Sequence, residues 1–201
     1  IQKPTRELSI EETLTWTFDI YTKNFTMFSI PFLIMALISG FFSVLIYGYI
    51  AEMSKIDATA PSEVVWSQFW SYILALLAIL FVFGIISWIV GSIINGVCVK
   101  CASDLIEKAR ASLGESLNLT LHKLVSLLAS ALIIGILVVL GLIALIIPGI
   151  ILFIMFYLVV PTILIEDVGA LDSLSRSRRL VSKRWLKTFC LALIVGLILV
   201  I

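Results

Sequence analysis

The chain has 201 residues, of which 61% are hydrophobic and 13% are charged, whereas soluble domains average roughly 45–50% and 25%. This composition excludes a water-soluble globular protein and indicates an integral membrane protein. Fourteen lysines and arginines stand against 13 acidic residues. The resulting net charge of +1 gives no reason to expect a nucleic-acid partner.

Apolar stretches without a charged residue dominate the chain. They run from Phe25 to Ile50, Phe69 to Val99, Leu124 to Ile147, Ile150 to Ile165, and Thr188 to Ile201. The first three exceed the roughly 20 residues that a helix needs to cross a bilayer. Pro148-Gly149 predicts a tight turn between the third and fourth stretches, and Pro161 predicts an irregular end to the fourth. We expect an all-α, polytopic transmembrane helical bundle that forms a single integral membrane domain over 1–201.

Basic residues predict the orientation. Thirteen of the 14 lysines and arginines precede the first stretch, lie between the second and third, or precede the fifth, and only Lys55 lies elsewhere. Because cytoplasmic loops retain positive charge, we expect a multi-pass protein of the cell membrane with a cytoplasmic amino terminus.

One short pattern precedes the first, third and fifth stretches, in units that start near residues 9, 112 and 169. Its instances are Ser9-Ile-Glu-Glu12-Thr13-Leu14 with Thr17, Ser112-Leu-Gly-Glu115-Ser116-Leu117 with Thr120, and Gly169-Ala-Leu-Asp172-Ser173-Leu174 with Ser177. A serine followed three residues later by Glu indicates a capping box at a helix start. We interpret the pattern as a triplicated unit, an amphipathic interfacial helix that leads into a membrane hairpin. Three matches to so short a pattern can also arise by coincidence. The repeat predicts that the fifth stretch continues and that a sixth span follows.

The strongest polar feature is a basic helix before the fifth stretch. Its candidate lipid head-group residues are Arg176, Arg179, Lys183, Arg184 and Lys187. A basic stripe beside an apolar one suits anionic lipids at the cytoplasmic surface. The alternative is that these charges only enforce the topology.

Arg178 falls within the apolar stripe of this helix, where an unpaired guanidinium would be costly. Glu166 and Asp167 are its candidate partners, and we expect one of them to pair with Arg178 as a structural clasp.

Four small or polar residues follow each other at helical spacing along the second stretch: Gly84, Ser87, Gly91 and Asn95. Such a stripe favours close helix packing. The alternative is a polar lining for a permeation path.

The sequence contains few residues that could bind a metal, carry out redox chemistry or act in catalysis. Cys98 and Cys101 form a C-x-x-C without a second pair, and His122 is the only histidine. No apolar stretch carries an ionisable side chain of the kind that ion-coupled transporters and intramembrane hydrolases use. We expect packing thiols, no metal, no cofactor and no catalytic residue.

Several features between the third and fifth stretches together resemble a known family. They are Pro148-Gly149, Pro161, Glu166 and the run from Ala170 to Val181. They are similar to the glycerophosphoryl diester phosphodiesterase membrane-domain family and to related uncharacterised prokaryotic multi-span proteins. The resemblance implies a prokaryotic membrane module that anchors a separate catalytic domain in fused members. The sequence departs from that pattern at Arg178, where the family often has an aromatic or apolar residue.

Our leading hypothesis is a non-enzymatic membrane module. It either interacts with membrane lipids, for which anionic lipids are candidates, or holds a protein partner at the cytoplasmic face. The first alternative is a carrier or channel component for a lipid-like or small neutral solute, lined by Ser87, Asn95 and Thr162. The second is an enzyme acting on glycerophosphodiesters through the family resemblance. The sequence predicts neither the oligomeric state nor the lipid.

Overall fold

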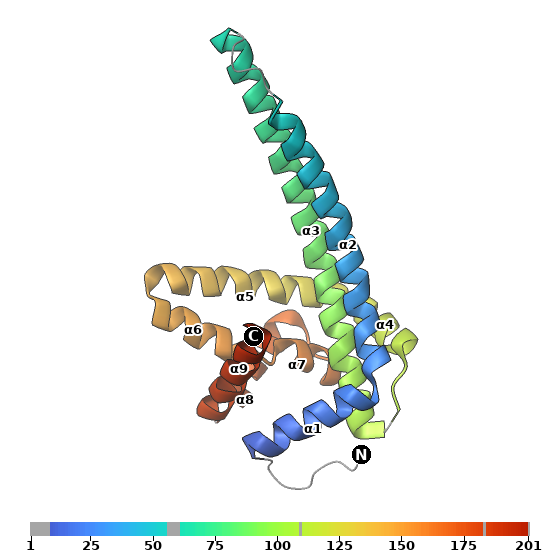
Figure 1. Cartoon of the computed structure of the whole chain (residues 1–201). Coiled ribbons are helices and arrows are strands. Elements are labelled where there is room, and N and C mark those ends of the chain that lie inside the picture. The colour runs from blue at the N-terminus through green and yellow to red at the C-terminus, as the bar shows by residue number, and fades with distance from the viewer. Residues whose placement is uncertain (1–8, 56–60, 109, 183, 201) are drawn as a thin grey trace. The chain divides into compact units, whose positions relative to one another are not determined.

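The computed structural model describes residues 9–55, 61–108, 110–182 and 184–200. All regular elements within these ranges are α-helices, which confirms the predicted all-α fold (Figure 1). They are α1 (Ile10–Lys23), α2 (Phe25–Met53), α3 (Ser62–Lys108), α4 (Leu113–His122), α5 (Leu124–Ala144), α6 (Ile146–Met155), α7 (Val159–Ile165), α8 (Ala170–Ser182) and α9 (Trp185–Val200).

Four helical stretches are long and apolar enough to cross a membrane: α2, α3, α5 and the stretch Ile146–Ile165, which comprises α6 and α7. Large apolar side chains on them are exposed, such as Val44 at 72% and Phe81 at 70%. Exposed apolar surface on this scale is suited to lipid rather than to water. The chain is a membrane protein.

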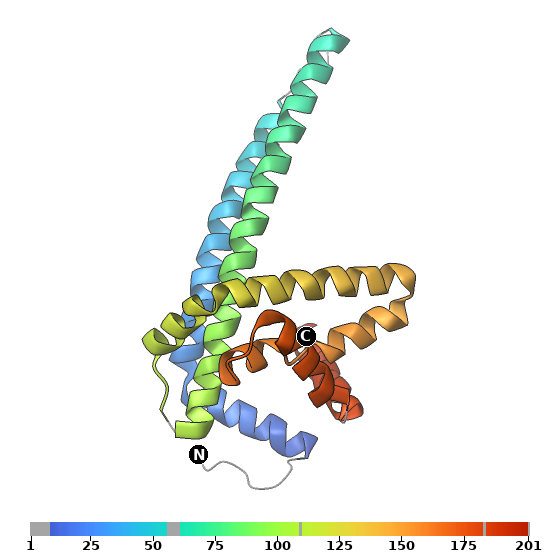
Figure 2. The same ribbon diagram turned by 180° about the vertical axis from the view of Figure 1, so that it is seen from behind.

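The chain divides into two compact units, residues 29–91 and residues 1–28 with 92–201. The smaller unit is an antiparallel helical hairpin made from parts of α2 and α3, which lie side by side in both views (Figures 1 and 2). Aromatic pairs join its two helices. The ring centroids of Phe42 and Phe83 are 4.6 Å apart, and those of Tyr49 and Tyr72 are 5.5 Å apart.

Within the described part of the chain, the small-residue stripe of α3 makes no close helix contact at its two glycines. A Cβ atom added at Gly84 or Gly91 would meet nothing within 4 Å among the described residues, and Asn95 is exposed. Paired aromatic rings join α2 to α3 instead. Small side chains permit close packing, but the larger apolar area of aromatic pairs makes them the stronger contact.

The larger unit contains the helix starts that the repeat predicts. α1, α4 and α8 are each followed within three residues by an apolar helix, respectively α2, α5 and α9. The capping box predicted at Ser9 is present, with Ser9 Oγ accepting from the Glu12 amide and Glu12 accepting from the Ser9 amide. The capping box predicted at Ser112 is wrong, because no side-chain hydrogen bond caps α4 there.

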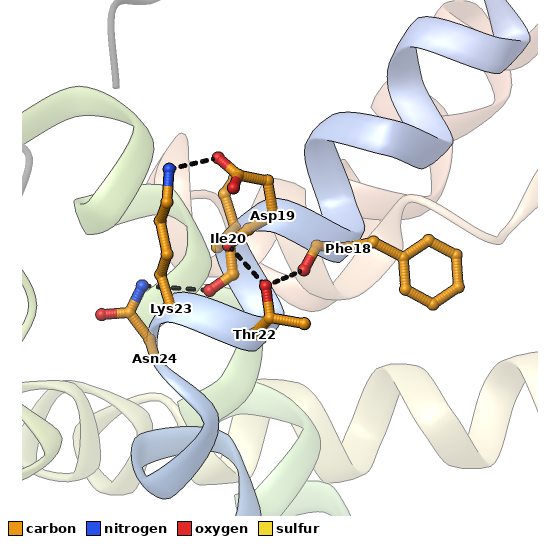
Figure 3. Close-up of polar contacts among 6 residues, drawn as sticks. All are labelled: Phe18, Asp19, Ile20, Thr22, Lys23 and Asn24. Carbon is orange, nitrogen blue, oxygen red and sulfur yellow. Dashed lines mark hydrogen bonds and ion pairs between the residues drawn. The ribbon is translucent and has the colours of Figure 1, made fainter.

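Local polar contacts close the carboxyl end of α1. Asn24 Nδ2 donates to the Ile20 carbonyl at 3.0 Å, and Thr22 Oγ1 donates to the Phe18 carbonyl at 2.9 Å. Lys23 Nζ lies 2.7 Å from Asp19 Oδ2. Figure 3 shows these contacts at the carboxyl end of α1, with the Phe18 ring pointing away from them. The polar contacts at the end of α1 are therefore all made between residues of that segment itself.

α5 and α6 form a tight hairpin, but its turn lies earlier than predicted. The extended residue is Leu145, with φ −167° and ψ 143°, and Pro148 and Gly149 lie in the first turn of α6. Proline is tolerated there because its missing amide hydrogen has no partner in the first turn. Gly149 instead permits close packing, since a Cβ atom on Gly141 would lie 3.0 Å from Gly149 Cα.

The predicted irregularity near Pro161 lies just before that residue. α6 ends at Met155, three residues follow without regular α-helix, and α7 begins at Val159. Pro161 is the third residue of α7, where its ring is again accommodated in a first turn.

Candidate functional site

The corner between α7 and α8 gathers the charged residues that the sequence singled out. α7 ends at Ile165 with Glu166 as its C-cap residue, and Asp167 adopts φ 57°, the one positive φ found among the described non-glycine residues. Asp tolerates this left-handed conformation better than most residues do. The reversal directs the chain into α8, which begins at Ala170.

Glu166 is held by Arg176. Arg176 Nε donates to Glu166 Oε2 at 2.6 Å, and Arg176 Nη2 donates to Glu166 Oε1 at 2.9 Å. This bidentate geometry is the strongest form of guanidinium–carboxylate contact. The hydrogen bonds from Arg176 lower the pKa of Glu166 below its ordinary value.

Asp167 forms an ion pair with Lys123, the residue that links α4 to α5. Both predicted clasp carboxylates are therefore paired, but neither ion pair found among the described residues involves Arg178. The prediction that Arg178 pairs with one of them is wrong in its choice of cation.

The orientation of α8 explains this difference. Its buried face consists of Ser173, Leu174, Ser177 and Val181, and three of these side chains are small enough for the helix to approach its neighbours closely. Arg178 is exposed at the margin of that face, and Leu171 is 71% exposed, so the apolar residues of α8 are not all buried. The guanidinium therefore needs no buried counter-ion.

Ser177 joins α8 to the break between α6 and α7. Its hydroxyl donates to the Met155 carbonyl at 2.7 Å and accepts from the Leu158 amide at 3.2 Å. Those two backbone groups lose helical partners where the helix is interrupted, and one fully buried hydroxyl satisfies both.

The predicted lipid residues divide into three groups. Arg176 is committed to Glu166, while Arg184 and Lys187 are engaged in other interactions. Arg179 is exposed and, like its neighbour Arg178, makes no ion pair within the described ranges. Lys183 lies outside the described residues.

A second ionic cluster was missed because we considered only the uncharged stretch, which ends at Val99. α3 instead continues to Lys108 and places Asp104, which is 4% exposed, 2.9 Å from Lys100 Nζ and 3.0 Å from Lys108 Nζ. The spacing of four residues on either side of Asp104 could have indicated both ion pairs, because such side chains share one helix face.

The positions of Cys98 and Cys101 are consistent with the expectation that they are packing thiols. Cys101 is 1% exposed, and its Sγ donates to Ser116 Oγ at 3.3 Å. All three cysteines are free thiols. Within the described ranges, no group of three or more His, Cys, Asp or Glu side chains has a geometry that could hold a metal ion.

The residues of the carrier hypothesis lie in different surroundings. Thr162 is 3% exposed and donates to the Val159 carbonyl at 2.8 Å. The Ser87 hydroxyl is buried and has no hydrogen-bond partner among the described residues, and Asn95 is exposed. The carrier hypothesis stays a prediction.

Residues 18–201 match the model of one protein family, described as a domain of unknown function (DUF7847). The chain belongs to this family. The match includes every helix that contributes to the corner between α7 and α8, so this corner is part of the DUF7847 domain. No curated protein and no solved structure shows significant similarity to the chain. The resemblance to the phosphodiesterase membrane domain stays a prediction.

Proposed function

We propose that this DUF7847 protein is a non-enzymatic membrane module that binds anionic lipid head groups at the cytoplasmic face through α8. The observation that carries this proposal is the pair Arg178 and Arg179. Both side chains are exposed, and neither makes an ion pair within the described ranges. Two adjacent guanidinium groups of this kind offer a phosphate group several hydrogen-bond donors at once.

The buried face of α8 supports the proposal. It is fixed by the buried residues Ser177 and Val181, so the two arginines are presented by a helix whose rotation about its axis is restricted. Arg176 contributes indirectly, because its bidentate bond occupies both oxygens of Glu166, a carboxylate that acts on Arg179 only through charge and makes no ion pair with it.

The positions of the basic residues support the cytoplasmic side. Thirteen of the 14 lysines and arginines fall in the segments assigned to one face, and the exception, Lys55, is paired with Glu52. Basic residues near an anionic leaflet contribute roughly 1 kcal/mol each to membrane attraction.

The proposal is tested by titrating phosphatidylglycerol, and phosphatidylcholine as the neutral comparison, into detergent-solubilised protein followed by native mass spectrometry. R178Q/R179Q should weaken phosphatidylglycerol binding about 30-fold, from roughly 1 kcal/mol for each charge, and leave phosphatidylcholine binding unchanged.

The matched control is K23Q/K55Q, which removes the same charge from two lysines that are already paired with Asp19 and Glu52. Equal phosphatidylglycerol binding by wild type and R178Q/R179Q would contradict the proposal. It would favour the alternative that these charges only enforce the membrane topology. A phosphodiesterase assay on the purified chain should show no activity, and turnover of a glycerophosphodiester would contradict the non-enzymatic assignment.

A further inference from the structure

Two serines lie beside the arginine pair on the exposed face of α8. Ser175 and Ser182 enclose Arg178 and Arg179 in the sequence, and each serine is three residues from one arginine and four from the other. Side chains at these spacings share one helix face. All four side chains are exposed. The face therefore consists of two guanidinium groups with a hydroxyl one helical turn away at either end.

The two kinds of side chain offer opposite hydrogen-bonding groups. An arginine side chain has donors only. Ser175 Oγ donates its hydrogen to the Asp172 carbonyl at 2.9 Å, and Ser182 Oγ donates its hydrogen to the Arg179 carbonyl at 3.2 Å. Because a hydroxyl has one hydrogen, each serine oxygen then presents only its acceptor lone pairs. The face has donors at its centre and acceptors at its ends.

A complementary ligand has the reverse arrangement. The oxygens of an ionised phosphodiester only accept hydrogen bonds, so they match the arginines and not the serines. The ends of the face require a ligand group that has a hydrogen to donate. Ser175 and Arg179 are four residues apart, as are Arg178 and Ser182, which corresponds to roughly 6 Å along the helix. A hydroxyl joined to the phosphate through a few covalent bonds can span this distance.

A hydroxyl fits the ends of this face better than an ammonium group does. An ammonium would lie close to two guanidinium groups, and like charges repel. α8 has one acidic side chain, Asp172, three residues before Ser175. Its carboxylate also accepts hydrogen bonds. A neutral hydroxyl can donate to the serine or to the carboxylate without repulsion from the arginines.

An apolar side chain on the same face favours a lipid over a soluble phosphodiester. Leu171 lies four residues before Ser175 and is 71% exposed. An exposed leucine beside polar groups suits the boundary between head groups and acyl chains. A soluble phosphodiester has no acyl chain to contact it.

We propose that the lipid bound by Arg178 and Arg179 carries a polyol head group, such as glycerol or inositol, whose hydroxyl donates to Ser175 or Ser182. The proposal rests on the proposed function of α8 and specifies the class of lipid, an anionic phosphodiester with free hydroxyl groups. The arginines bind the phosphate, and the serines select among anionic lipids. Because a serine lies at either end, the head group can extend in either direction along the helix.

The test compares phosphatidylglycerol with phosphatidylethanol, a phosphodiester lipid of the same charge whose head group has no hydroxyl. Binding to the full chain in detergent is measured by native mass spectrometry. S175A/S182A removes both hydroxyls of the face. The matched control is S54A/S67A, because Ser54 and Ser67 are exposed and each donates to the carbonyl three residues before it. Circular dichroism verifies that the helical content is unchanged.

Wild type and S54A/S67A should bind phosphatidylglycerol about fivefold more tightly than phosphatidylethanol, the effect of one hydrogen bond, and S175A/S182A should bind the two lipids equally. Three results would each overturn the proposal: equal binding of the two lipids by wild type, a preference retained by S175A/S182A, or tighter wild-type binding of phosphatidylethanolamine than of phosphatidylglycerol. Displacement of phosphatidylglycerol by an equal concentration of soluble glycerophosphoglycerol would also overturn it, because the ligand would then need no acyl chain.

R178Q/R179Q separates this proposal from the proposed function. This variant should bind both phosphatidylglycerol and phosphatidylethanol more weakly than wild type, since both carry the phosphate. Wild-type binding of both lipids by R178Q/R179Q would overturn the proposed function and the polyol selectivity together. Weakened binding of both lipids by R178Q/R179Q, with no selectivity in wild type, would overturn the polyol selectivity alone.

Discussion

Arg176 and Glu166, ten residues apart in the sequence, meet through two hydrogen bonds of 2.6 and 2.9 Å across the corner between α7 and α8. Because both side chains are partly exposed, solvent and salt weaken the pair. E166Q should lower the thermal unfolding midpoint slightly in dilute buffer. The difference from wild type should disappear near 1 M salt, where the screening length is about 3 Å. A salt-independent difference would show that Glu166 acts through packing instead.

The same pair predicts a dependence on pH. Because Arg176 lowers the pKa of Glu166 in the folded state, the pair stabilises the fold fully above the unfolded pKa of Glu, about 4.3, and this stabilisation is lost as the pH falls through the lower folded value. Unfolding midpoints of wild type and E166Q should differ by a constant amount from pH 7 down to pH 5. They should converge only in more acidic buffer, and convergence already at pH 6 would contradict the lowered pKa.

Ser177 should be the most sensitive hydroxyl of α8. S177A leaves the Met155 carbonyl and the Leu158 amide without their shared partner, at a cost of about 1–3 kcal/mol in the free energy of unfolding. The control is S175A, since Ser175 is exposed and bonds only to the Asp172 carbonyl of its own helix. Denaturant unfolding in detergent measures both, and equal losses would refute the bridging role.

Gly149 should tolerate no side chain. A Cβ atom at this position would lie 2.5 Å from Leu142 Cγ and 2.9 Å from the Leu142 amide nitrogen, so G149A should destabilise the protein by about 1–3 kcal/mol. G135A is the matched control on the same hairpin, because a Cβ atom at Gly135 meets nothing within 4 Å. It should be neutral or stabilising, since alanine favours helix more than glycine does. The comparison fails if thermal unfolding ranks the two variants in the opposite order.

The apolar helices could be predicted from the sequence because runs of uncharged residues have few alternatives to a membrane helix. The start of α1 was also predictable, since the capping box at Ser9 is a local interaction. The cation that pairs with Glu166 could not be predicted from the sequence. Arg176 and Arg178 differ only in which face of α8 is buried, and tertiary packing around Ser177 decides that face. A signal existed in the repeated pattern, whose small hydroxyl residues recur at equivalent positions.

The turn at Leu145 has a consequence for how the protein enters the membrane. From Leu124 to Ile165 the chain carries no charged side chain and no histidine, and Leu145 itself is exposed and apolar. Insertion of this hairpin therefore requires no charged group to be transported across the lipid. We expect both helices to enter together from the side on which they are synthesised, and we expect no hydrophilic loop between them that a protease or an antibody could reach.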